Sequence, residues 1–167
     1  AGLDETAITS SAPTLGVANI GNDPDVAGSG RIAFNSSGSA VVNIGGTYGA
    51  DGAAAVNPLV YALTVSNSVS GLSVTDGSLI TLVKEGNVIV GRVASGAFAG
   101  QAAFAIAIDA TSGVVTVEQY LSLDHPSNPN PDDMISLALG SLGVTVARTD
   151  GDGDSDVHAA TNRDSLV

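Results

Sequence analysis

Apolar residues in this chain recur at every second position within short runs, and turn residues rich in glycine separate the runs. In LVYALTVSN (59–67), Leu59, Tyr61, Leu63 and Val65 fall on one side of an extended chain. This alternation is typical of a β-strand with one buried face. No segment has the apolar period of a helix. The segment GAAAV (52–56) is expected to form at most a short turn of helix.

Similar runs recur along the chain from Gly38 onwards. They predict further strands in 39–48, 78–83, 87–93, 101–109, 114–123, 134–140 and 142–149, and KEGN (84–87) predicts a hairpin turn. Eight or nine short strands with turns every 8–12 residues indicate an all-β fold, an antiparallel β-sandwich with long acidic and Gly-rich loops. A barrel or jelly roll is the alternative. We expect one domain over 1–167, with an acidic C-terminal segment at 150–167.

The charge balance excludes several classes of function. Five Lys and Arg against 17 Asp and Glu leave a net charge of −12, which argues against binding to nucleic acid or to anionic lipid. No apolar run is long enough to span a membrane. The chain has no cysteine and no GxSxG motif, and its two histidines lie in polar segments, so we expect no enzyme.

The stretch TDGDGDSD (149–156) places Asp150, Asp152, Asp154 and Asp156 on alternate residues. In an extended chain the neighbouring carboxylates would be about 6–7 Å apart and would repel one another. Either solvation in an acidic linker or a bound Ca²⁺ ion offsets this repulsion. An EF-hand is excluded, because the twelfth position from Asp150 is Thr161 rather than Glu.

Any calcium ion held by these aspartates therefore needs oxygen ligands from elsewhere in the fold. The acidic candidates are Asp4 and Glu5 near the start, Asp51, and the loop 124–133 with Asp132 and Asp133. The pair Asp132 and Asp133 is equally compatible with a solvated turn. Asp51, in YGADGA, is also compatible with a β-turn that requires Asp-Gly.

Several segments together resemble one family. LDET, GADGA, LVYALTVS, GNVIVGRV, IDATSGVVTVEQYLSLDHP and VTVARTDGDGDSD occur in an order similar to a domain of the large repeats-in-toxin (RTX) adhesins, which Gram-negative bacteria export by type I secretion. The resemblance covers about Leu3 to Asp156. It implies an extracellular, cell-surface module excised from a multidomain adhesin of calcium-stiffened β-sandwiches, monomeric and joined to flanking adhesin domains.

The resemblance also implies a function in adhesion and biofilm formation. Some domains of these adhesins bind peptide or protein C-terminal ends on host or neighbouring cells, with calcium helping to hold the peptide carboxylate. The small residues beside Tyr48 would let a peptide backbone approach, so we expect the peptide site at Tyr48, Gly49, Asp51 and Gly52. The alternative is a structural spacer without a ligand of its own, in which calcium only stiffens the domain; calcium-mediated sugar binding is a variant of the first.

Overall fold

The computed structural model describes residues 14–24, 30–125 and 135–161. Within these residues the chain forms nine β-strands and no helix. The strands are β1 (Ala33–Ala40), β2 (Leu59–Val65), β3 (Val69–Ser73), β4 (Leu79–Glu85), β5 (Val88–Val93), β6 (Ala102–Ile108), β7 (Val114–Gln119), β8 (Leu142–Thr149) and β9 (Ser155–Thr161). The described part of the chain contains no long apolar helix of the kind that crosses a membrane.

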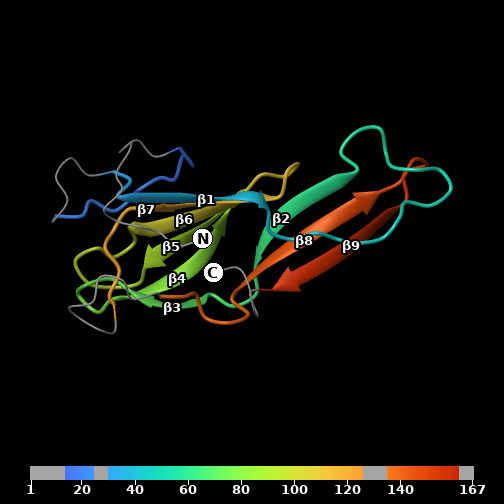
Figure 1. Cartoon of the computed structure of the whole chain (residues 1–167). Coiled ribbons are helices and arrows are strands. Elements are labelled where there is room, and N and C mark those ends of the chain that lie inside the picture. The colour runs from blue at the N-terminus through green and yellow to red at the C-terminus, as the bar shows by residue number, and fades with distance from the viewer. Residues whose placement is uncertain (1–13, 25–29, 126–134, 162–167) are drawn as a thin grey trace.

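The strands form two sheets, and every pairing between named strands is antiparallel. The larger sheet has the order β1-β7-β6-β5-β4-β3, and the smaller one has the order β2-β8-β9 (Figure 1). The main core contains buried residues from both sheets, including Leu63 and Val144 from the smaller sheet and Leu82, Ile89 and Ile106 from the larger. The predicted all-β antiparallel fold is confirmed, and a shared core between two sheets is the arrangement of a sandwich.

Local sequence explains the central hairpin. Strands β4 and β5 pair from Ile80↔Val93 to Glu85↔Val88, so only Gly86 and Asn87 remain for the turn. Gly86 has a φ of 63°, a left-handed conformation that glycine adopts without steric cost. The predicted turn in KEGN is therefore confirmed.

A second, smaller core lies on the other face of the larger sheet. Leu15, Val17 and Ile20, from the segment before β1, pack against buried residues of β5, of β6 and of the position just after β7: Val90, Ala102, Ala105 and Tyr120. Two backbone hydrogen bonds hold this segment along β6, from Gly21 N to Ala102 O (2.8 Å) and from Ala102 N to Asn19 O (2.9 Å). The larger sheet is thus buried on both faces at its centre, which explains why all the residues from Ala102 to Ala105 are buried.

The buried carboxylate of Glu118 on β7 fixes the start of this covering segment. Glu118 is fully buried and accepts hydrogen bonds from Thr14 N (2.8 Å), Thr14 Oγ1 (2.5 Å) and Tyr120 Oη (2.9 Å). Its Oε1 also forms an ion pair with Arg31 Nη1 at 2.8 Å. Burial raises the pKa of Glu118, but the hydrogen bonds from Thr14 and Tyr120 outweigh this effect and hold it below its usual value.

Two expected strands are wrong, and three strands, β1, β3 and β9, were not expected. Of the strand expected over 39–48, only Ser39 and Ala40 are extended, as the end of β1, and the following residues form a loop. No strand forms in 135–140, the described part of the run 134–140, where Leu139 is 75% exposed. Conversely, β9 lies within the acidic C-terminal segment and pairs along its full length with β8, from Thr149↔Ser155 to Gly143↔Thr161.

Figure 1 shows the smaller sheet extending past the end of the larger one. The segment before β2 runs beside the end of the smaller sheet that is farthest from the larger sheet. At that end β8 turns into β9, and the turn contains the run of aspartates. The fold therefore places the acidic turn away from the main core, beside the loop 41–58.

Candidate functional site

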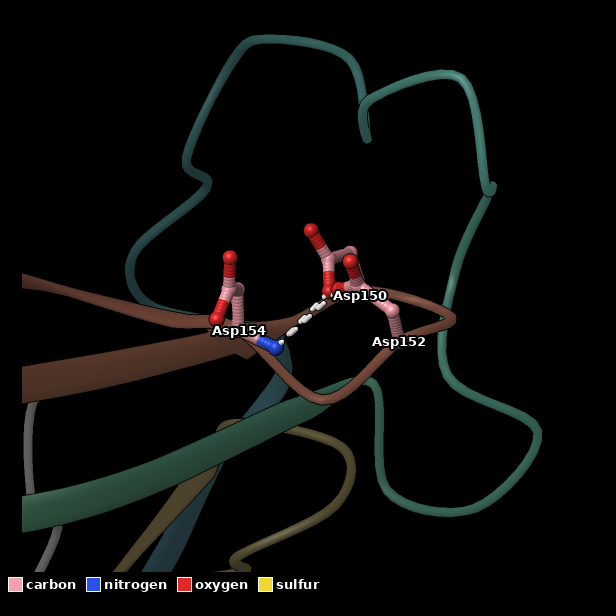
Figure 2. A group of neighbouring side chains, drawn as sticks. All are labelled: Asp150, Asp152 and Asp154. Carbon is pink, nitrogen blue, oxygen red and sulfur yellow. Dashed lines mark hydrogen bonds between the residues drawn. The ribbon is translucent and has the colours of Figure 1, made fainter.

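The turn between β8 and β9 is a compact loop of residues 150–154. Asp150 N donates to Asp154 O (3.0 Å), and Asp154 N donates back to the Asp150 side chain at Oδ1 (2.9 Å). Gly153, at a φ of 99°, allows the chain to reverse. The side chains of Asp150, Asp152 and Asp154 lie on the same side of this loop (Figure 2).

These three carboxylates form a close cluster. One oxygen from each lies within 4.8 Å of the others. Two oxygens that bind the same calcium ion at about 2.3–2.6 Å are at most about 5 Å apart, so the spacing is compatible with one shared cation. The donor set contains only oxygen, which suits a hard cation such as Ca²⁺ or Mg²⁺ better than a transition metal. Three side chains also leave coordination positions for water, for carbonyl groups or for a ligand.

Mutual repulsion is visible in the acidity of this cluster. A hydrogen bond with Asp152, then burial and the charge of Asp152, raises the pKa of Asp150 above its ordinary value. The same hydrogen bond lowers the pKa of Asp152. The charge of one aspartate therefore opposes ionisation of its neighbour, and a divalent cation would relieve this repulsion.

The loop that the sequence predicts as a peptide site lies directly against this turn. Gly151 N donates to Gly52 O (2.9 Å), and Ala54 N donates to Thr149 O (3.1 Å). A Cβ atom on Gly151 would meet Asp51 O at 2.3 Å, so no larger residue fits there without movement of the loop. Glycine at position 151 is therefore what allows the two loops to touch.

Between the two loops is an open pocket of about 170 Å³. Its lining consists of Thr47, Tyr48 and Gly49 from one loop, and Arg148, Asp150, Asp154, Ser155 and Asp156 from the ends of β8 and β9 and their turn. Tyr48 and Gly49 thus share a pocket with three of the predicted calcium ligands. Asp51 and Gly52 belong to the adjoining loop but are not part of the lining, and Asp152 belongs to the cluster only.

The other predicted ligands are placed differently. Asp156 stands apart from the cluster of three, because its Oδ2 lies 3.0 Å from His158 Nε2 and 3.9 Å from Arg148 Nη2. Asp4, Glu5, Asp132 and Asp133 lie outside the described residues. Their part in a metal site stays a prediction, as does that of Asp156.

Sequence reasoning did not select Arg148 as a site residue. Its signal lies in the alternation of β8, where Val144 and Val146 face the main core and Arg148 is the next residue on that face. A charged residue in a core-facing position at a strand end indicates that the face has become polar. Here that position opens into the pocket.

Taken together, these features define an all-β sandwich domain with an acidic turn and an adjoining pocket at one end. The chain belongs to the family described as a domain of unknown function (DUF5801), whose profile matches residues 1–161. Searches of curated proteins and of solved structures found no match.

Proposed function

We propose that this domain is a calcium-dependent ligand-binding module of a bacterial surface adhesin, and that it binds the C-terminal ends of peptides or proteins on other cells. One observation supports the proposal above all. The aspartates selected as calcium ligands and the loop selected as a peptide site are about 100 residues apart in sequence, yet residues of both line the same pocket.

A bound calcium ion would make this pocket attractive to an anion. The chain carries a net charge of −12, and three aspartates line the pocket, so a peptide carboxylate alone would be repelled. A calcium ion bound to Asp150, Asp152 and Asp154 would reverse the local field and would retain open coordination positions. Recognition of a terminal carboxylate is an established mode of peptide binding, and the small lining residue Gly49 leaves room for a backbone.

The proposal is tested by thermal melts of the whole chain in calcium and in chelator, each with a pool of random hexapeptides bearing either a free or an amidated C-terminus. A ligand at about 100 times its Kd adds about 2.7 kcal/mol to the free energy of unfolding, or roughly 5–10 °C for a domain of this size. We expect calcium to raise the melting temperature and free-carboxylate peptides to raise it further, only when calcium is present.

Asp152→Asn should remove most of the calcium effect, because it removes one of the three carboxylates of the cluster. The fold itself should be little affected, because the hydrogen bond that Asp152 accepts comes from Asp154 N within the same turn. Glu85→Gln is the matched control, since it removes one exposed carboxylate on β4, outside the pocket. Stabilisation by calcium with no response to any peptide would instead favour a structural spacer. A melting temperature that calcium leaves unchanged would rule out both functions.

A further inference from the structure

Arg148 occupies a distinctive place in the pocket wall. It is the only Lys or Arg among the described residues that line the pocket, and the other charged groups there are carboxylates. Its side chain is 20% exposed, so the guanidinium is largely enclosed but remains accessible from the pocket. A cation that is partly shielded from water interacts more strongly with an anion than one on an open surface.

The surrounding loop holds the guanidinium in position. Arg148 Nη1 donates to Gly45 O (3.3 Å), and the guanidinium carbon lies 5.8 Å from the centre of the Tyr48 ring. A Cβ atom on Gly46 would come within 2.7 Å of Arg148 Nη1, so glycine at this position lets the backbone pass close to the side chain. The arginine is therefore oriented before any ligand arrives.

Most of the hydrogen-bonding capacity of Arg148 is still available. A guanidinium has five N–H donors, and the described residues accept one hydrogen bond from it, at Gly45. The nearest carboxylate, Asp156, is 3.9 Å from Nη2, too far for a hydrogen bond. A planar fork of donors with this much unused capacity matches the geometry of an incoming carboxylate.

The charge balance of the site also favours a positively charged side chain beside the calcium ion. The cluster of three aspartates and Asp156 contribute four negative charges around the pocket. One calcium ion would balance only two of them, and Arg148 reduces the remaining excess from two to one. Calcium alone would therefore leave the pocket more repulsive to a carboxylate than calcium and Arg148 together.

We propose that Arg148 receives the carboxylate of the ligand, so that the terminal carboxylate of a peptide bridges the Arg148 guanidinium and the cation at Asp150, Asp152 and Asp154. This inference rests on the proposed function, and it adds the residue that distinguishes a free C-terminus from an amidated one. Arg148 thereby sets specificity, while the aspartates set the calcium requirement.

The test measures retention of the two hexapeptide pools, free and amidated, by wild type and Arg148→Gln at saturating calcium, together with calcium binding by calorimetry. Lys84→Gln is the matched control, because it makes the same change in net charge at an exposed residue of β4. Arg148→Lys keeps the charge but loses the fork of donors. Thermal melts in chelator verify that each variant is folded.

For Arg148→Gln we expect the preference for free over amidated peptides to fall by at least about tenfold, the scale of one charge-assisted hydrogen bond. Calcium affinity should stay within about threefold of wild type, or rise slightly as a nearby positive charge is lost. Arg148→Lys should be intermediate, and Lys84→Gln should match wild type. A structural role alone would weaken both peptide pools equally.

An unchanged preference in Arg148→Gln, with wild type binding the free pool, would overturn the role of Arg148 and leave the proposed function standing. Loss of calcium binding in Arg148→Gln would also overturn it, because the residue would then act on the metal site. Failure of wild type to retain the free pool in calcium would overturn the proposed function and this inference together.

Discussion

The buried carboxylate of Glu118 offers a direct test of what holds the N-terminal segment on the larger sheet. Glu118 is fully buried, forms an ion pair with Arg31 and accepts hydrogen bonds from Thr14 and Tyr120. In Glu118→Gln the side chain keeps its shape but loses its charge. Its amide group presents N–H donors where Thr14, Arg31 and Tyr120 also donate.

The expected cost follows from this geometry. Removing one partner of a buried ion pair typically costs about 3–5 kcal/mol, because the other charge stays buried without its counter-ion. Since the amide oxygen of Gln can still accept hydrogen bonds, we expect the lower part of this range, about 3 kcal/mol. For a domain of this length that corresponds to a fall of roughly 6–12 °C in melting temperature.

Urea denaturation followed by circular dichroism measures the change in the free energy of unfolding. Glu85→Gln is the control, because Glu85 pairs with Arg92 at 2.8 Å but is 38% exposed, and exposed pairs contribute at most about 1 kcal/mol. A loss below about 1 kcal/mol in Glu118→Gln would refute the reasoning, since the buried pair would then contribute no more than the exposed one.

The pH dependence gives a second readout of the same residue. The pKa of Glu118 is below its ordinary value in the folded state, so its stabilising contribution is present above the ordinary value of 4.5. That contribution is lost as the pH falls through the lowered value. Between neutral and acid pH the stability of wild type should therefore fall more steeply than that of Glu118→Gln.

Two further substitutions test close approaches in the fold. Gly151→Ala should reduce peptide retention while leaving the aspartates unaltered, because its Cβ atom would meet Asp51 O at 2.3 Å and separate the two loops; wild-type retention in this variant would contradict the contact. Gly91→Ala should lower the free energy of unfolding by about 1–3 kcal/mol, because its Cβ atom would lie 2.5 Å from the Phe104 ring. Phe104→Leu in the same chain should recover part of this loss, and a purely additive double variant would show that the ring is not the cause.

Strong alternation was the part of the fold that sequence could predict. Strands β2 and β8 begin where the patterns of LVYALTV and LGVTVART predict, because one face of each is packed in the main core. The run 39–48 failed because Val41, Val42 and Ile44 pack against the core from a loop, so apolar residues were present without ladder partners. Strand β9 was missed because its exposed, polar residues gain their order from pairing with β8.

The candidate site could be predicted only in part for a related reason. The aspartate run and the small-residue loop are each recognisable in the sequence, because charge crowding and glycine turns are local features. Their shared pocket depends on the pairing of β2 with β8, which brings Leu59 opposite Arg148. No local pattern contains that register. The alternation of β8 marks Arg148 as a polar residue on the core-facing side, but only the placed strands show that it lines the pocket.

The sheet order has a consequence for how the chain acquires its structure. Strand β2 pairs with β8, which is about 80 residues later, and Thr14 reaches Glu118 across 104 residues. Contacts of such long range must overcome a large loop-closure entropy, which places folding on the order of milliseconds to seconds rather than microseconds. During synthesis, while β8 is still inside the ribosome, β2 has no neighbouring strand to pair with. Strand β2 can therefore join its sheet only after β8 has been synthesised. The pocket forms only after the acidic turn between β8 and β9 has been synthesised as well.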